Sequence, residues 1–228
     1  MFGNERVGAV IAAGGLSQRM GGIDKTLAQL GRAPVLGWVC AAFQQCTAVD
    51  QVVVVLPERS LDEGRHLVAE RGWSKVGSVV AGGARRQDSV LNGLEKLENC
   101  RWAVIHDGAR PLVTPELIER GLAAAAETGA AIAAVPVTDT IKVAADDLTV
   151  QGTPPRRNLW SVQTPQVFRY DLIVAALGQL KIEVTDDSAA VERAGGRVKI
   201  YLGAYDNIKI TTPDDLDVAE LLLRKRGG

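Results

Sequence analysis

A glycine-rich stretch near the start of the chain places two cations beside a run of small residues. Positions 12–25 read AAGGLSQRMGGIDK and directly follow an apolar run at 7–13. Small residues let a backbone approach a ligand closely, and consecutive N–H groups can cradle an anion, whose charge Arg19 and Lys25 could neutralise. The stretch is neither a P-loop nor a GxGxxG fingerprint. A flexible loop with two solvated cations is the alternative, but a position after a buried strand favours a phosphate site.

A second polar stretch, at 82–89, reads GGARRQDS and again follows an apolar run. Its backbone N–H groups and the Ser89 hydroxyl could bind a base or a phosphate where a helix begins. The alternative is that Ser89 or Asp88 simply caps that helix. Which of Arg85 and Arg86 faces such a site stays open at this point.

A third stretch, at 106–111, reads HDGARP. Asp107 could hold a divalent cation or sugar hydroxyls, and the planar fork of Arg110 could reach a phosphate. An internal Asp–Arg pair that fixes the turn is the structural alternative. We expect His106 to be a packed histidine at the end of a strand and not a catalytic base.

Five more polar motifs each have a structural interpretation beside the functional one. The first three could be turns of an extended segment, the fourth a capped helix, and the fifth an edge strand that carries Lys209. They lie at 139–142 (DTIK), 156–160 (RRNLW), 164–166 (TPQ), 185–188 (TDDS) and 206–211 (DNIKIT).

The elements that must position these motifs alternate along the chain. Short runs rich in Val, Ile and Ala predict strands buried on both faces of a parallel sheet. They lie at 7–13, 51–56, 76–81, 102–106 and 130–135, and helical spacing separates them at 35–43, 61–70, 89–97 and 115–127. Thr114 and Thr212, each followed by proline, predict helix N-caps. The pattern predicts a doubly wound, mostly parallel α/β sheet of the Rossmann-like type, in one domain spanning 1–228.

From 136 to about 163 the alternation stops. Pieces with β-like composition at 140–143 and 159–162 surround a polar stretch that contains two adjacent prolines. Such a long connection predicts a projecting β-hairpin arm at about 137–160. Because an exposed hairpin is marginal alone, we expect a second subunit to cover it.

Composition excludes several classes of protein. With 26 Lys and Arg against 27 Asp and Glu, the net charge is −1, which argues against general binding to nucleic acid or to a membrane surface. No stretch approaches the ~20 apolar residues of a membrane span. The three cysteines form no CxxC pair, so neither a disulfide framework nor a zinc site is indicated. We expect a cytoplasmic protein.

Taken in order, the motifs resemble those of one family, the 2-C-methyl-D-erythritol 4-phosphate cytidylyltransferases of the non-mevalonate isoprenoid pathway. The resemblance runs from about Val7 to Leu222, and its most specific parts are HDGARP, DTIK, RNLW with TPQVF, TDDS and DNIKITTPDDL. The first loop is one residue longer than the family's AAGxGxRM and is similar to the AGGxSxRMGxDK of molybdenum-cofactor guanylyltransferases. Ala84 stands where the family commonly has Asp, and Gly108 where it usually has Ala.

The resemblance implies a role for individual residues. It implies four catalytic cations, a CTP site shaped largely by backbone, and a site for methylerythritol phosphate, with Asp107 as a candidate Mg²⁺ ligand beside the CTP phosphates. The cations are Arg19, Lys25, Arg157 and Lys209. The CTP site comprises Ala12, Ala13, Gly14, Gly83, Ala84, Ser89, Asp107 and Gly108, and the acceptor site Arg110, Thr140, Thr164 and Thr185. The family forms homodimers through the arm, so Thr140 and Arg157 would serve the neighbouring subunit.

The implied reaction is attack by the acceptor's phosphate oxygen on the α-phosphorus of CTP, with release of pyrophosphate. A phosphate dianion is already nucleophilic at neutral pH, so positioning and charge neutralisation by Mg²⁺, Lys and Arg are what the reaction needs. The alternatives are a ribitol 5-phosphate cytidylyltransferase, a molybdenum-cofactor guanylyltransferase, and a nucleotide-binding module without turnover. Under the first interpretation we expect Arg19, Lys25, Arg86, Arg110, Arg157 and Lys209 to gather around one site.

Overall fold

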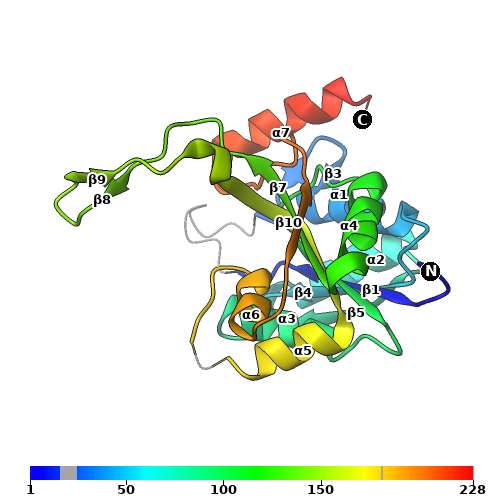
Figure 1. Ribbon diagram of the computed structural model, residues 1–228. Helices are drawn as coiled ribbons and strands as arrows, with labels where there is room; N and C mark the ends of the chain where they lie inside the picture. Colours follow the sequence, from blue (N-terminus) through cyan, green and yellow to red (C-terminus); the bar gives the residue numbers. More distant parts are fainter. Residues whose placement is uncertain (16–24, 181, 228) are drawn as a thin grey trace.

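The computed structural model describes residues 1–15, 25–180 and 182–227. Within them, a central sheet has the strand order β11-β7-β10-β6-β1-β4-β5 (Figure 1). Neighbouring strands are parallel except where β10 runs antiparallel to both β6 and β7. The strands are β1 Val7–Ala12, β4 Gln51–Leu56, β5 Val76–Ala81, β6 Trp102–Asp107, β7 Ala130–Pro136, β10 Trp160–Arg169 and β11 Lys199–Leu202. The sequence-based strands are confirmed to within one residue at each end.

Helices cover both faces of the sheet, as the doubly wound prediction requires. One face packs against α1 Val35–Gln45, α2 Leu61–Arg71 and α4 Pro115–Thr128. The other packs against α3 Arg86–Leu94, α5 Tyr170–Gly178 and α6 Asp187–Arg193. Strand β1 serves both cores, because Ala9 and Ile11 face the first and Val10 the second. A fully buried side chain of the size of Val10 or Ile11 stabilises the fold by ~1.5–3 kcal/mol.

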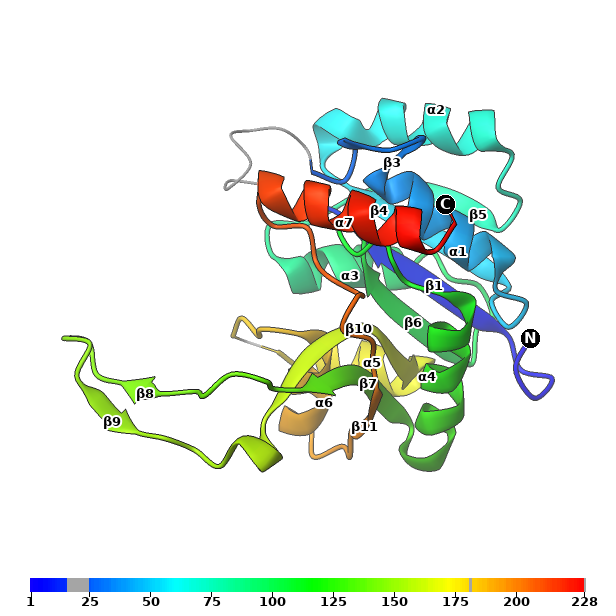
Figure 2. The ribbon, with the colours of Figure 1, turned by 90° about the horizontal axis from the view of Figure 1, so that it is seen from above.

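The last helix, α7 Pro213–Lys225, lies outside these two layers (Figure 2). Its Ala219 and Leu223 pack with Leu30, Leu112 and Ile210 in a third, small core. The chain also forms short strands and 3₁₀ helices outside the central sheet, among them β2 Gln29–Leu30, β3 Ala33–Pro34, η2 Glu58–Ser60 and η3 Arg156–Asn158. The small core attaches the segment before α7 to the main body, and that segment carries Lys209.

Helix starts follow the caps that the sequence indicates, with one exception. The Thr114 hydroxyl accepts the N–H of Leu117 at 3.3 Å, and Asp215 accepts the N–H of Thr212 at 2.8 Å. Helix α3 begins at Arg86, three positions before the predicted start at 89. Asp88 causes the difference, because its carboxylate reaches back to the N–H of Arg85 at 3.0 Å and closes a capping box upstream.

The predicted arm projects from the body between β7 and β10, and both Figure 1 and Figure 2 show it extending away from the sheet. Its hairpin is formed by β8 Val143–Ala144 and β9 Val150–Gly152. The β-like pieces were expected elsewhere, and this part of the prediction is wrong. Positions 140–142 carry no strand, and 160–162 begin β10, which pairs with β7 in the central sheet because β7 offers it a long partner.

Among the described residues, no helix is long and apolar enough to cross a membrane.

Candidate active site

The carboxyl ends of the parallel strands surround a pocket of about 650 Å³. It is lined by backbone following β1 and β5, by the end of β6, and by Lys25 and Lys209. Strands β1 and β6 are in register so that Ala12 lies opposite Asp107. Three motifs that are far apart in the sequence therefore meet at one rim, because parallel strands end on the same side of a sheet.

The glycine loops that follow β1 and β5 approach each other over the Ser89 hydroxyl. A side chain at Gly14 would come within 3.1 Å of that hydroxyl, and one at Gly82 within 2.8 Å. The hydroxyl accepts the N–H of Gly83 at 3.0 Å and donates to the carbonyl of Arg85 at 3.2 Å. Ser89 is therefore not a helix cap. Its hydroxyl fixes the shape of the pocket wall that the backbone of the two glycine loops forms.

A second pocket, of about 450 Å³, adjoins the first and is lined by polar side chains from β10 and from the start of α6. Arg110, Thr164 and Thr185 lie on its wall. The Arg110 guanidinium is held by the backbone carbonyl of Asn207 at 2.8 Å. Gln166 donates to Asp186 at 2.8 Å and accepts the N–H of Ser188 at 3.0 Å, so β10 fixes the start of α6.

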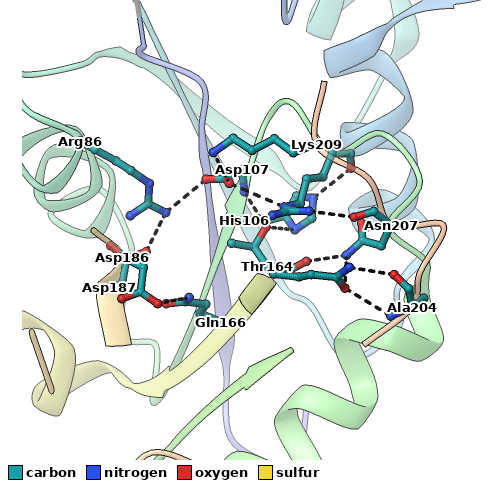
Figure 3. A network of polar contacts seen from close by, with 12 residues as sticks. Arg86, His106, Asp107, Thr164, Gln166, Asp186, Asp187, Ala204, Asn207 and Lys209 are labelled. Carbon is teal, nitrogen blue, oxygen red and sulfur yellow. Dashed lines mark hydrogen bonds and ion pairs between the residues drawn. The ribbon is translucent and has the colours of Figure 1, made fainter. Parts of the chain in front are cut away.

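Three charged residues, Arg86, Asp107 and Lys209, line both pockets. Figure 3 shows the cations on either side of Asp107. One carboxylate oxygen lies 2.8 Å from the Lys209 amine and 3.7 Å from Arg110 Nε, and the other lies 3.2 Å from Arg86. Burial alone raises the pKa of the Asp107 carboxyl, but Arg86 and Lys209 outweigh it and hold that pKa below its ordinary value. Asp107 is therefore ionised at neutral pH.

His106 is buried beneath this junction and has both ring nitrogens occupied. Nε2 lies 3.1 Å from the carbonyl of Arg110, and Nδ1 lies 3.0 Å from the Thr164 hydroxyl. A carbonyl oxygen only accepts, so Nε2 carries the proton and donates to Arg110. In the neutral ring Nδ1 then accepts from the Thr164 hydroxyl, which itself accepts the N–H of Asp107 at 3.0 Å. Burial lowers the pKa of His106 to about 4. His106 is thus a neutral imidazole in one tautomer that helps to position Asp107. The expectation of a packed histidine at the end of a strand is confirmed.

Comparison with known proteins places the chain in a family. The family model for 2-C-methyl-D-erythritol 4-phosphate cytidylyltransferase matches residues 7–225. The chain belongs to this family. A relative of that name from Dehalococcoides mccartyi (strain ATCC BAA-2266 / KCTC 15142 / 195) is 51% identical over 225 residues, covering 99% of both chains. The family match supports the cytidylyltransferase interpretation over the ribitol and guanylyltransferase alternatives.

Solved structures of the same family resemble this fold. The 2-C-methyl-D-erythritol 4-phosphate cytidylyltransferase of Thermus thermophilus superposes with a TM-score of 0.79 at 33% identity, covering 96% of this chain and 99% of that one. The 4-diphosphocytidyl-2C-methyl-D-erythritol synthase of Anaerococcus prevotii gives 0.85 at 30% identity, covering 96% of both. The protein is therefore a CTP-dependent cytidylyltransferase of isoprenoid precursor biosynthesis with an α/β nucleotidyltransferase fold.

Most of the residues that the sequence nominated line one or both pockets of this cytidylyltransferase. The first pocket contains Ala12, Ala13, Gly14, Lys25, Gly83, Ala84, Ser89, Asp107 and Lys209. The second contains Asp107, Arg110, Thr164, Thr185 and Lys209. Gly108 lines neither pocket and packs against Ala13 instead. Lys209 lies in a loop and not in an edge strand, so that structural alternative is wrong.

Two further nominated residues of the described part of the chain line neither pocket. Thr140 and Arg157 lie at the arm, exposed, and line neither pocket of their own chain. Arg19 falls outside the described residues, so its predicted role stays a prediction. The expected gathering of cations holds for Lys25, Arg86, Arg110 and Lys209 among the described residues.

Other residues of the site had no distinctive signal in the sequence. Arg86, which the sequence could not separate from Arg85, lines both pockets, while Arg85 lines only the first and pairs with Asp88 at 2.7 Å. Asp187 and Gln166 stood out only as parts of TDDS and TPQ, yet both are fully or almost fully buried in the polar network. Their burial depends on contacts between distant segments, which no local pattern reports.

The site has little room for a metal ion held by protein alone. In the described part of the chain, no three His, Cys, Asp or Glu side chains are grouped to hold one. A carboxylate accepts about four hydrogen bonds or ligands, and three cations already surround Asp107. The donor set therefore fits a Mg²⁺ that arrives with a triphosphate and takes Asp107 as at most one ligand.

Proposed function

We propose that the first pocket binds CTP and the second binds methylerythritol phosphate, and that the two react beside Asp107. The observation that carries this assignment is that the pockets join, sharing Arg86, Asp107 and Lys209. A nucleotide whose α-phosphorus lies at this junction would face the acceptor phosphate directly. The reaction needs such an in-line approach.

The chemistry of the junction suits a nucleophile that is already charged. The acceptor's phosphate oxygen attacks the α-phosphorus, a new P–O bond forms, and the bond to pyrophosphate breaks. No general base is required, and His106, buried and with both nitrogens engaged, is not available as one. What the site must supply is cations close to the α-phosphate, where charge accumulates in the transition state.

The first pocket suits a nucleotide because its walls are backbone. The backbone following β1, at Ala13 and Gly14, and that following β5, at Gly83 and Ala84, would surround the base and sugar. Lys25, with Arg19, would neutralise the β- and γ-phosphates. Asp107 would be the protein ligand of a Mg²⁺ that arrives with CTP, and the ion would supply Lewis-acid stabilisation of the phosphate charge.

The second pocket suits a sugar-alcohol phosphate because donors and acceptors are mixed on its wall. Arg110 would pair with the phosphate, while the hydroxyls of Thr164 and Thr185 lie near the polyol. Lys209, with 38% of its side chain exposed, would swing from Asp107 to the attacking and leaving phosphates. Its flexible stem permits such a movement.

We further propose that the arm completes the site of a second subunit in a homodimer. Apolar side chains at its tip are exposed, with Leu148 at 84% and Val150 at 56%. Thr140 and Arg157 line neither pocket of their own chain. A second copy related by two-fold symmetry would cover the apolar tip and receive both side chains.

The cytoplasm is the compartment that we propose for this enzyme, in which the chain works as one domain with its arm. The free thiols of Cys40, Cys46 and Cys100 support a reducing environment.

Substrate choice tests the assignment of the pockets. Pyrophosphate release should be measured with Mg²⁺, methylerythritol phosphate and each of the four nucleoside triphosphates in turn, and then with CTP and ribitol 5-phosphate. We expect turnover with CTP and methylerythritol phosphate only. Absence of turnover with that pair, or a preference for GTP or ribitol 5-phosphate, would contradict the proposal.

Subunit complementation tests the shared site. Arg157→Ala and Lys209→Ala should each lose activity alone, yet a mixture allowed to exchange subunits should regain about a quarter of the wild-type rate. About half of the dimers are then mixed, and each holds one site with both residues intact. Continued inactivity of the mixture, despite dimers in sedimentation, would show that Arg157 serves its own chain.

A further inference from the structure

Arg86 makes contacts that the other cations of the site do not. One of its terminal nitrogens lies 3.2 Å from Asp107 and 2.8 Å from Asp187, so it bridges two carboxylates (Figure 3). It is the first residue of α3, and Asp187 is the first residue of α6. The bridge therefore connects the helix that follows the glycine loop of the first pocket to the helix that borders the second.

Asp187 requires a cation beside it because its carboxylate is completely buried. Its exposed fraction is 0%, and neither carboxylate oxygen has a hydrogen-bond partner of good geometry. Burial raises the pKa of this carboxyl, and Arg86 opposes the rise. A buried carboxylate is costly unless a cation accompanies it. Arg86 is the cation that does so. If it moved away, Asp187 would remain as a buried, unpaired carboxylate, which is energetically unfavourable.

Arg86 and Lys209, which both contact Asp107, therefore differ in their freedom to move. Lys209 has 38% of its side chain exposed, against 30% for Arg86. Lys209 has no second carboxylate within ion-pair distance in the described residues, whereas Arg86 has Asp187. When a phosphate dianion enters, Lys209 can exchange Asp107 for it. Arg86 stays, because moving it would strip the charge compensation from Asp187.

The next residue of α3 strengthens the same connection. Gln87 is 3% exposed, donates to the carbonyl of Ile182 at 3.2 Å and accepts the N–H of Val184 at 3.2 Å. The segment that leads to Thr185 is therefore fixed to the start of α3 by two backbone contacts, with the Arg86–Asp187 pair beside them.

We propose that Arg86 is a positioning residue for cytidylyl transfer: anchored by Asp187, it keeps Asp107 and the Thr185 segment in place while Lys209 turns to the phosphates. The inference rests on the proposed assignment of the two pockets. It requires that Asp187 act on the reaction only through Arg86. Loss of the contact between Arg86 and Asp187 should therefore weaken binding of the acceptor more than binding of the nucleotide.

A pair of variants separates this role from a merely structural one. Arg86→Met leaves Asp187 as a buried, unpaired carboxylate and should lower Tm by roughly 5–15 °C. Adding Asp187→Asn removes that charge and should restore Tm. The double variant should nevertheless keep a KM for methylerythritol phosphate raised ~10-fold or more and a kcat lowered ~10–100-fold, since Asp107 loses its contact with Arg86 and the Thr185 segment loses the Arg86–Asp187 pair. The Kd for CTP, measured by calorimetry, should change by less than ~3-fold.

Asp187→Asn alone should raise the KM for methylerythritol phosphate several-fold, while Asp171→Asn, which breaks the exposed pair with Arg169, serves as the matched control. Recovery of kcat and KM together with Tm in the double variant would overturn the proposal, because Arg86 would then only neutralise Asp187. Unchanged kinetics in Asp187→Asn would overturn it as well. A wild-type enzyme without turnover would instead overturn the pocket assignment, and this inference with it.

Discussion

Replacing Gly108 by alanine would test how closely the first glycine loop depends on its neighbours. A Cβ at this position would lie 2.7 Å from the Cβ and 3.4 Å from the Cα of Ala13. Neither atom can rotate away, because both belong to a residue whose backbone is fixed. The N–H of Ala13 donates to Val55 at 2.8 Å, and the N–H of Gly108 donates to Ala12 at 2.9 Å.

The size of the effect follows from that distance. Carbon atoms rest about 3.5–4.0 Å apart, so the backbone at Ala13 must move by about 1 Å. Such crowding in a packed region costs about 1–3 kcal/mol of folding stability. A displacement of about 1 Å in a binding site can reduce rates by up to about 10²-fold. We therefore expect the KM for CTP to rise ~10–100-fold, with a smaller change in the KM for methylerythritol phosphate.

Steady-state kinetics with each substrate varied in turn, together with urea unfolding, would measure both effects. Gly178→Ala is the matched control, because a Cβ there would meet no atom within 4 Å. The outcome is informative because alanine is what the family's usual pattern has at position 108. A Gly108→Ala enzyme with wild-type KM values and stability would refute the argument that the fixed backbone of Ala13 requires glycine opposite it.

Three further changes probe other parts of the molecule. Folding lowers the pKa of His106 from 6.5 to about 4, so its contribution to stability is complete above pH 6.5 and is lost as the pH falls towards 4. The shift corresponds to about 3 kcal/mol, which urea unfolding at pH 7 and pH 4 should show for the wild type and not for His106→Gln; equal losses would contradict it. Lys25→Ala should slow pyrophosphate release ~10²–10³-fold, and unchanged turnover would remove the role assigned to this lysine. Thr114→Ala, which deletes the cap of α4, should cost about 1 kcal/mol in thermal unfolding and leave kcat unaltered.

The strands of the fold could be predicted because their signal is local. A strand buried on both faces must be apolar at nearly every position, and Val52–Leu56 or Ala103–Ile105 satisfies that condition without reference to any partner. The start of α3 was predicted three residues late because the capping box at Asp88 uses a side chain that also looks like an N-cap. The start of β10 was assigned to the arm because β-like composition does not say which strand it will pair with.

The residues of the candidate site could likewise be predicted only in part. The sequence alone determined that small residues and cations follow the strands, and parallel strands carry such residues to a common rim, so Asp107 and Lys25 could be nominated without a structure. Only the tertiary structure decided which charges meet. Lys209 and Asp107 lie far apart in the chain, and Arg86 reaches Asp187 only because α3 and α6 pack on the same face of the sheet. Ion pairs depend on distances of a few ångströms between distant segments, which packing sets and local composition does not.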